Sequence, residues 1–584
     1  MSSSSRSALA VLGRYLLPQW PRVLLLAVLL LGSIGLQLYV PLVLQRFIDT
    51  AQQQGALATL YRLAGVYLGA AVIVQLMQAG ATYVGADVGW TSTNRLRADL
   101  MRHLMNLDMA YHKDHTPGEM IERVDGDVTA LSNFFSQFSV RVFGAMLLLV
   151  GSLGVFWWRD WRVGLGVTLF AGLTLTVLLR LRRIGVEPSR QEREASARLY
   201  GFIEERLTGL DDLRALGAGP HALRGFLGVQ KDFFWKSRAA WISRSVVWRA
   251  SFVLFAIGYT AVLGAAVGMY AAGLVTIGTV YLYYQYMTLV EDPIDQLTQQ
   301  LQELQKAGAS LIRVGEVLAL RTTLHSGERA LPEGPLEVRF DDVTFSYGSG
   351  EDHAPVLRGV DLTIGAGRVV GLLGRTGSGK TTLTRLVTRL YDPTLGAVRV
   401  AGVDTRDLDT GALRERVAVV TQDVQLFQAS VRDNLTLFDD RVPDDRVEEA
   451  LKEAGLGDWL AGQPEGVRTP LAAGSLSAGE AQLLAFARVL LRDPGVVILD
   501  EPSSRLDPAT EARLTLAMTN LLRGRTAIVI AHRLDTVARA DDILVLGDGR
   551  VLEYGPRETL ARDRASRYSA LLSAGRSDLE EVLS

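Results

Sequence analysis

The chain has 584 residues, of which 48% are apolar, a length beyond one domain and an apolar content above that of an ordinary soluble enzyme. Its 61 basic and 63 acidic residues nearly cancel, so the charge balance gives no reason to expect nucleic acid as a partner. The absence of cysteine excludes disulfides, thiolate metal sites and cysteine nucleophiles.

Six apolar stretches in the first half predict an all-α membrane domain with six transmembrane helices. Most of them approach the roughly 20 residues that a helix needs to cross a bilayer. The stretches come in pairs, and two long polar segments, 85–141 and 182–251, separate one pair from the next. We expect these segments to extend the helices beyond the membrane. The stretches cover residues 23–44, 60–84, 142–158, 163–181, 252–272 and 275–290.

Lys and Arg gather in the two long polar segments and are scarce in the short connections. Positive charge of this kind marks the cytoplasmic side of a membrane. We therefore expect a multi-pass protein of the cell membrane, in contact with the lipid bilayer, with both termini in the cytosol. The alternative for the shorter stretches, 142–158 and 275–290, is that they are buried helices of a soluble protein.

Gly and Pro punctuate residues 321–335, which predicts a linker between a membrane domain at 1–320 and a second domain at 336–584. Beyond the linker, short strand-like runs alternate with helical patterns, as in α/β nucleotide-binding domains. The fold class is therefore a helical membrane domain fused to an α/β domain. The strand-like runs cover residues 336–340, 343–347, 369–373, 417–421, 496–499, 527–530 and 543–546.

A phosphate-binding loop, GRTGSGKT, follows the strand-like run at 369–373 and precedes a helical pattern. Backbone amides of such loops wrap nucleotide phosphates, and the helix N-terminus adds a favourable dipole. Lys380 would reach the β- and γ-phosphates and Thr381 would coordinate magnesium. The sequence therefore predicts that ATP and Mg²⁺ bind at Gly374, Thr376, Gly377, Ser378, Gly379, Lys380, Thr381 and Thr382.

Two adjacent acids, Asp500 and Glu501, follow the strand-like run at 496–499. Asp500 would hold magnesium, directly or through water, and Glu501 would orient and deprotonate the attacking water. Two acids at a strand end are more often a solvated turn than a site. Their position after a phosphate loop and shortly after the motif LSAGE favours the catalytic interpretation.

The run LSAGE at residues 476–480 is a variant of the LSGGQ signature. With this motif, the chain resembles a half-transporter of the ATP-binding cassette exporter family, in which six spans precede one cassette. In that family the signature, here Ser477 and Gly479, closes over the γ-phosphate of a nucleotide held by a second cassette. The resemblance therefore implies that two chains act as a pair.

The resemblance also assigns roles residue by residue. Tyr347 matches the aromatic residue that stacks on adenine, and Gln422 matches the glutamine that senses magnesium. Asp507 belongs to a loop that crosses to the opposite cassette. In isolation each match has an ordinary alternative, since Tyr347 could be an edge-strand tyrosine and Gln422 a polar loop residue.

The family mechanism implies in-line attack by water on the γ-phosphate. Glu501 acts as the base or positions the water, while Lys380 and His532 stabilise phosphoryl charge. In isolation, His532 could equally be a helix cap. The magnesium would be surrounded by Thr381, Gln422 and Asp500.

The predicted function is ATP-driven export of an amphipathic or lipophilic small molecule, lipid or peptide by alternating access. The resemblance places coupling helices near residues 109–115 and 209–217. Two alternatives remain open: a channel or receptor regulated by nucleotide, and a soluble-type cassette switch without transport.

The signature departs from the family pattern, because Ala478 replaces a glycine and Glu480 replaces the glutamine. Glu501, by contrast, is intact. In exporter pairs of this kind, a retained glutamate with a poorer signature implies one half of a heterodimer, with a second half-transporter as partner. The alternative is a homodimer that tolerates both substitutions.

Overall fold

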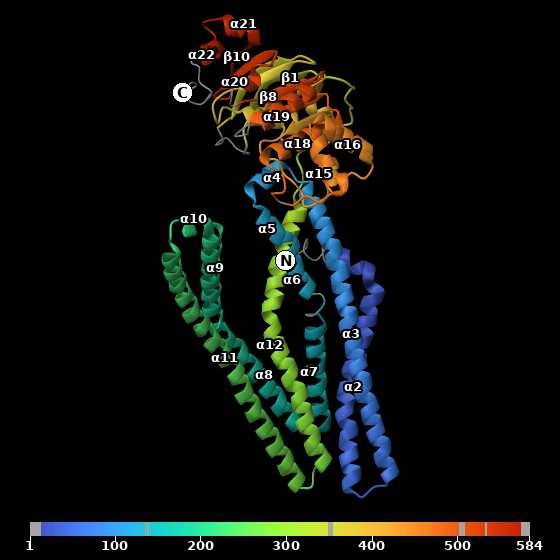
Figure 1. Cartoon of the computed structure of the whole chain (residues 1–584). Helices are drawn as coiled ribbons and strands as arrows, with labels where there is room; N and C mark the ends of the chain where they lie inside the picture. The colour runs from blue at the N-terminus through green and yellow to red at the C-terminus, as the bar shows by residue number, and fades with distance from the viewer. Residues whose placement is uncertain are drawn as a thin grey trace. The chain divides into compact units, whose positions relative to one another are not determined.

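The computed structural model describes residues 13–134, 136, 139–348, 354–472, 474–500, 508–531 and 534–573. The chain forms two compact units, one made of residues 1–105 and 117–320 and the other of residues 106–116 and 321–584. The described part of the first unit is helical, and the second contains the described strands (Figure 1).

The first unit is built from long helices. In Figure 1, α2 and α3 run side by side, while α9 and α11 form a hairpin that α10 closes. The long helices are α2 (Trp20–Gln52), α3 (Leu57–Met105), α7 (Ser139–Arg159), α8 (Trp161–Ile184), α9 (Val186–Thr208), α11 (Gly219–Ala271) and α12 (Ile277–Ala319). The short ones are η1 (Leu17–Gln19), α5 (Pro117–Ile121), the π-helical η2 (Glu122–Asp127), α6 (Val128–Asn133) and α10 (Leu210–Ala215).

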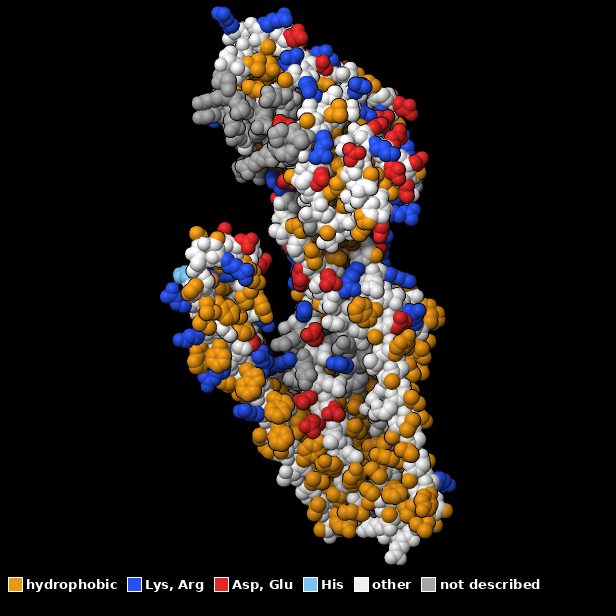
Figure 2. All heavy atoms as spheres, in the orientation of Figure 1, with side chains coloured by type: hydrophobic (Ala, Val, Ile, Leu, Met, Phe, Trp, Pro, Cys, Tyr) orange, Lys and Arg blue, Asp and Glu red, His pale blue; other side chains and the backbone are white. Residues whose placement is uncertain are grey.

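Five helical stretches of the described chain are long and apolar enough to cross a membrane: Gly13–Gln52, Leu57–Met105, Arg141–Arg159, Trp161–Thr208 and Gly219–Ala271. They correspond to the first five predicted spans. The sixth, 275–290, forms the start of α12, where a short, tyrosine-rich run is followed at once by Glu291 and Asp292. Figure 2 shows hydrophobic side chains covering the end of this unit where α11 meets α12, as a lipid-facing surface requires.

The second unit contains two sheets. The larger has the order β10-β9-β3-β8-β7-β6, in which β10 is antiparallel to β9 and the remaining neighbours are parallel. The smaller, antiparallel sheet has the order β2-β1-β4-β5. The strands are β1 (Val338–Phe345), β2 (Leu357–Ile364), β3 (Val369–Leu373), β4 (Leu395–Val400), β5 (Val403–Asp404), β6 (Val417–Val420), β7 (Val496–Asp500), β8 (Thr526–Ile530), β9 (Asp542–Gly547) and β10 (Arg550–Pro556).

The two strand-like runs at 336–340 and 343–347 form one strand, β1, rather than two. Its pairing with β2 shifts register between Phe340 and Val343, and Asp342 adopts a positive φ of 47° at this irregularity. An extra residue in a strand makes such a bulge without ending the strand. The sequence break at 341–342 therefore marks a bulge, and Tyr347 lies just beyond the strand.

Helices surround the sheets of the second unit, and α4 (Met109–Asp114) belongs to this unit although its neighbours in sequence do not. One core lies between the sheets and includes Phe340, Leu372 and Leu544, and a second joins α15, α16 and α18. The helices are α13 (Lys380–Val387), α14 (Thr410–Arg416), α15 (Val431–Thr436), α16 (Asp444–Glu453), α17 (Gly457–Ala461), α18 (Ala478–Arg492), α19 (Pro508–Leu522), α20 (Leu534–Val537), α21 (Arg557–Arg562) and α22 (Arg567–Ser573), with 3₁₀ turns η4 (Thr405–Asp407) and η5 (Gly466–Arg468).

An ion pair between the buried Asp127 and the partly exposed Arg313 fixes η2 against α12. Asp127 is 1% exposed and accepts hydrogen bonds from Ser310 Oγ at 2.9 Å, Arg313 Nε at 3.0 Å and Arg123 Nη1 at 3.3 Å. Burial, the largest influence, raises the pKa of Asp127, but the hydrogen bonds from Arg313 and Ser310 and the Arg313 charge together hold it below its ordinary value. The carboxylate is therefore stabilised in its charged form.

We expect Asp127→Asn to lower stability by about 2 kcal/mol, because it removes the negative charge that pairs with Arg313 and replaces one acceptor oxygen with an NH2 donor. The measurement is the thermal unfolding temperature of the purified protein at neutral pH. Since the folded-state pKa of Asp127 is lowered, its contribution is present above about pH 4 and is lost as the pH falls through the folded-state pKa.

The matched control is Asp125→Asn in the same π-helical turn. Asp125 is 73% exposed and pairs with Arg97 at 3.3 Å, so its loss should change stability by less than about 1 kcal/mol. Equal effects of the two substitutions would contradict the role given to Asp127.

Candidate functional site

The phosphate-binding loop lies at the carboxyl end of β3, which runs between β8 and β9 in the six-stranded sheet. Residues Val370 to Leu373 of this strand are buried, so the strand end is held in place by the core. The loop leads directly into α13, which begins at Lys380. Ligands of open α/β sheets bind at the carboxyl ends of the strands, and here a helix N-terminus adds backbone N–H donors.

Two glycines permit the loop to turn closely against neighbouring backbone. Gly374 has φ +157°, and a Cβ on it would lie 2.3 Å from the carbonyl oxygen of Leu546 in β9. Gly379 has φ +103°, and a Cβ there would lie 2.7 Å from the Leu357 side chain. Neither position accepts a side chain without displacement of the loop, which explains two of the glycines in the motif.

The loop side chains are suited to an anion. Ser378 Oγ is buried and has no hydrogen-bond partner among the described residues. Lys380 is 6% exposed, and its Nζ donates to the carbonyl oxygens of Gly374 at 2.6 Å and Arg375 at 3.0 Å. A buried ammonium and an unsatisfied hydroxyl beside a helix N-terminus fit a phosphate group.

A cavity of about 440 Å³ joins this loop to two other predicted site residues. Its lining includes Tyr347 from beyond β1 and Asp500 from the end of β7. The loop residues that line it are Arg375, Thr376, Gly377, Gly379, Lys380, Thr381 and Thr382. An aromatic ring, a phosphate loop and a carboxylate therefore share one cavity, as a nucleotide requires.

Tyr347 also makes contacts that the sequence does not predict. Its Oη lies 2.9 Å from Thr382 Oγ1 and accepts a hydrogen bond from Arg385 Nη1 at 3.2 Å. The Lys113 ammonium lies 4.2 Å from the centre of the Tyr347 ring, a cation–π contact. Arg385 follows the loop by one helical turn, which is a usable signal, but nothing in the sequence links Lys113 to Tyr347.

Lys113 belongs to α4, which Asp108 anchors within the second unit. Asp108 accepts hydrogen bonds from Thr323 N at 2.7 Å and Thr323 Oγ1 at 2.8 Å, and also from Thr322 Oγ1. Burial raises the pKa of Asp108, but these hydrogen bonds together lower it below its ordinary value.

A short helix lies at each position where a coupling helix was predicted. These helices are α4 within 109–115 and α10 within 209–217.

A larger groove of about 990 Å³ brings together the predicted metal ligands Thr381, Gln422 and Asp500. A hydroxyl, an amide carbonyl and a carboxylate are oxygen ligands of the kind that Mg²⁺ prefers, with phosphate oxygens and water completing the set. Within the described residues, no cluster of three His, Cys, Asp or Glu offers a metal site. The donors present therefore fit magnesium held partly by a nucleotide.

The signature motif lies apart from this cavity. Ser477 caps α18, and its Oγ accepts a hydrogen bond from Glu480 N at 3.3 Å, while Glu480 Oε2 accepts from Ser477 N and Ser477 Oγ at 2.8 Å each. Gly479 is buried in the first turn. Neither Ser477 nor Gly479 is among the described residues that line the two cavities.

Three predicted site residues, Glu501, Asp507 and His532, lie outside the residues that the structure describes. Their roles stay predictions. The described part of the site consists of Tyr347, the phosphate loop, Gln422, Asp500 and the signature.

Comparison with known proteins gives two family matches. Residues 23–294 match the model of the ABC transporter transmembrane region, and residues 357–504 match the ABC transporter model. The structure is similar to that of a bacterial Atm1-family ABC exporter with ATP bound, with a TM-score of 0.79 at 22% sequence identity, over 96% of this chain and 98% of that one. This structural likeness shows the fold.

Curated relatives are similar along most of the chain. A multidrug efflux ATP-binding/permease protein of Mycobacterium bovis is 32% identical over 540 residues, covering 91% of this chain and 45% of the relative. A leukotoxin translocation ATP-binding protein of Mannheimia haemolytica is 30% identical over 565 residues, covering 93% of this chain and 77% of the relative. The chain thus spans about half the length of the mycobacterial relative.

We expect Tyr347→Ala to raise the ATP concentration for half-maximal hydrolysis by roughly tenfold, because stacking on a base contributes affinity. The maximal rate should change comparatively little, as it does when binding alone is lost. Tyr347→Phe is the matched control, since it removes only the hydroxyl that contacts Thr382 and Arg385. A collapsed maximal rate with unaltered ATP affinity in Tyr347→Ala would refute the stacking role.

Proposed function

Because the chain belongs to the ATP-binding cassette transporter family, we propose that it is an exporter subunit of the cell membrane driven by ATP. It moves an amphipathic or lipophilic substrate outward by alternating access, with both termini in the cytosol. The names of the two relatives, multidrug efflux and leukotoxin translocation, support export. Residues 1–320 form the transmembrane domain, except that 106–116 belong to the second compact unit. Residues 321–335 form the linker and 336–584 the nucleotide-binding domain.

The observation that carries this proposal is the cavity that joins Tyr347, the phosphate loop and Asp500. β7 pairs with β8, and β8 pairs with β3, all in parallel, so Asp500 and the loop lie at the same edge of the sheet. That edge supplies both a phosphate cradle and a carboxylate for a cation. Together these groups are what hydrolysis of a nucleoside triphosphate needs.

In the proposed reaction, water attacks the γ-phosphate in line and the bond to the β-phosphate oxygen breaks. Glu501 accepts the proton of the attacking water. Lys380 and His532 stabilise the charge that develops on the phosphoryl oxygens. Magnesium, held by Thr381, Gln422 and Asp500, neutralises phosphate charge when it is bound.

Transport itself is tested in inverted membrane vesicles. ATP should drive accumulation of a fluorescent lipophilic dye in vesicles that contain the intact protein, and Lys380→Ala should abolish it. Equal accumulation with ATP and with a non-hydrolysable analogue would contradict an ATP-driven exporter.

We expect Glu501→Gln to lower ATP hydrolysis by on the order of a hundredfold or more while nucleotide binding is kept, because the general base is lost. Hydrolysis and nucleotide binding are measured separately on the purified complex. Glu453→Gln, an exposed substitution at the end of α16, is the control and should hydrolyse ATP at the normal rate. A near-normal rate in Glu501→Gln would remove Glu501 from the catalytic role.

The proposal includes a second, different half-transporter as partner. In the described structure the Glu480 carboxylate occupies the N–H and hydroxyl donors of Ser477, which are the groups that would meet a partner's phosphate. A carboxylate about 6 Å from a phosphate charge repels it by roughly 3 kcal/mol at an effective dielectric near 20, partly offset by the helix N-terminus. The site under this signature is therefore the weaker one of the pair.

The strong site then combines the phosphate loop and Glu501 of this chain with the partner's unaltered signature. The partner is expected to carry LSGGQ and to have lost its glutamate, often to aspartate. The physical basis is again the repulsion between a signature carboxylate and phosphate. A partner signature that has glutamine in place of Glu480 carries no such carboxylate, so it does not repel the nucleotide bound to this chain.

We expect the chain purified alone to hydrolyse ATP slowly, and the chain co-expressed with a neighbouring half-transporter gene to form a one-to-one complex with faster hydrolysis. ATPase rate and subunit stoichiometry are the two measurements. Vigorous, cargo-stimulated hydrolysis by a homodimer would exclude the asymmetric pair and leave the exporter assignment intact.

A further inference from the structure

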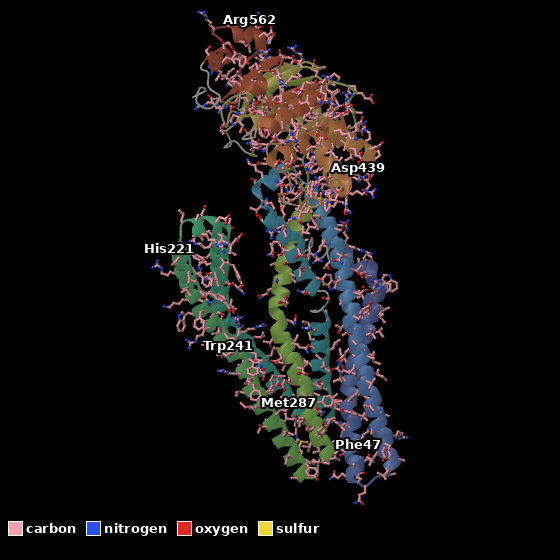
Figure 3. The ribbon with its side chains drawn as sticks, viewed as in Figure 1. Phe47, His221, Trp241, Met287, Asp439 and Arg562 are labelled. Atoms are coloured by element: carbon pink, nitrogen blue, oxygen red, sulfur yellow. The ribbon has the colours of Figure 1, made fainter. Side chains whose placement is uncertain are left out.

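A separate cavity of about 230 Å³ lies among α2, α3 and α12 in the helical unit. Four of its lining residues are polar: Gln37 on α2, Gln75 on α3, and Gln285 and Thr288 on α12. In Figure 3, Met287 marks this level of α12 and Phe47 marks the far end of α2. The rest of the lining is aliphatic, so three carboxamides line an otherwise apolar space.

Two of the three carboxamides are unpaired. Within the described residues, the Gln37 and Gln75 side chains have no hydrogen-bond partner. The Gln285 carboxamide, by contrast, is bonded at both ends, because its Nε2 donates to Tyr281 Oη at 2.9 Å and its Oε1 accepts from Thr288 Oγ1 at 3.4 Å. Thr288 Oγ1 also donates to the backbone carbonyl oxygen of Gln285 at 2.6 Å. Gln37 is half-buried and Gln75 is exposed, so both unpaired carboxamides are open to a ligand in this cavity. A bond to that ligand would offset the cost of a polar group at membrane depth.

Gln45, on the same helix as Gln37, shows what a structural glutamine does in this bundle. It is 6% exposed, its Nε2 donates to Thr279 Oγ1 at 2.9 Å, and its Oε1 accepts from Arg159 Nη2 at 2.7 Å. Both ends of that carboxamide are satisfied by neighbouring helices. Gln37, about 12 Å along α2 at about 1.5 Å per residue, lacks any such bond.

Pro41 adds a backbone acceptor to the cavity. It lies inside α2 and lines the cavity, and it has no N–H with which to bond the carbonyl oxygen of Gln37 one turn earlier. The Leu38 carbonyl, next in the chain, already accepts a hydrogen bond from Tyr286 Oη instead of serving the helix alone. The Gln37 carbonyl therefore lacks its usual donor four residues on, which adds an acceptor beside the carboxamides.

No charged side chain is among the described residues that line the cavity. A ligand that carries a full charge would therefore be buried at this level without a counter-ion, which is costly in a membrane interior. A neutral group with both N–H and C=O, by contrast, can pair with carboxamides at either end. The volume suits part of a ligand rather than a whole drug-sized molecule.

We propose that Gln37, Gln75, Gln285 and Thr288 form a subsite for a neutral amide group of a lipophilic substrate, so that uncharged apolar peptides are among its substrates. This inference rests on the proposed export function and names its substrate class. The carboxamides pair with the peptide N–H and C=O groups, and the aliphatic walls contact its side chains.

The test is fluorescence titration of the full-length protein in lipid nanodiscs without nucleotide. The probe is an uncharged, dansyl-labelled trileucine amide, and a dansyl-labelled quaternary ammonium of similar lipophilicity is the comparison. Gln37→Leu, Gln75→Leu and Gln285→Leu should each weaken binding of the tripeptide amide by about fivefold to thirtyfold, the effect of one lost hydrogen bond in an apolar site. Gln78→Leu is the matched control on α3, outside the lining, and should bind the probe normally.

Gln75→Glu keeps the test decisive if a leucine variant fails to fold, because Gln75 is exposed in the described structure. The new carboxylate should reverse the preference toward the quaternary ammonium. Normal tripeptide binding in the leucine variants, or an unchanged preference in Gln75→Glu, would overturn the subsite.

ATP-driven uptake of the same probe into inverted vesicles separates this inference from the proposed function. Uptake by the wild type, with binding unaffected by the substitutions, refutes the subsite alone. Binding that depends on the glutamines, without ATP-driven uptake, supports the subsite and refutes export of this probe.

Discussion

The burial of β3 is the constraint on which the nucleotide site depends. A loop that binds phosphate through backbone N–H groups must begin at a fixed point, and here that point is the end of a strand paired on both sides. β9 also supplies the carbonyl of Leu546 that leaves no room for a side chain at Gly374. The sheet therefore determines where the loop lies and also requires glycine at position 374.

A different constraint governs the helical unit, where polar groups must find partners within the bundle. The Gln45 side chain forms hydrogen bonds with Thr279 and Arg159. The Asp49 carboxylate accepts hydrogen bonds from Gly278 N at 2.9 Å and from Thr276 Oγ1 at 2.9 Å. These bonds join α2 to the start of α12. The carboxamides of Gln37 and Gln75 differ from these two side chains, because neither has a hydrogen-bond partner among the described residues.

The sequence predicted the elements whose pattern is local. The strand at 369–373 and the loop after it depend on a continuous apolar run followed by glycines, and β3 has those bounds. β2, β4, β5 and β10 were not predicted. β2 and β10 expose residues along their length, so neither forms a continuous apolar run, and β5 has only two residues. Contacts between distant segments, such as Lys113 with Tyr347, depend on tertiary packing that no local pattern encodes.

The second unit is assembled from two separate pieces of sequence, because residues 106–116 join 321–584. During synthesis, α4 emerges more than 200 residues before Thr323 and Tyr347, the residues that Asp108 and Lys113 contact. Until those residues are synthesised, Asp108 and Lys113 lack the partners that they contact in the folded chain. A fragment that begins at residue 321 lacks α4, and it therefore lacks the part of the groove lining that Met109, His112 and Lys113 supply in the whole chain.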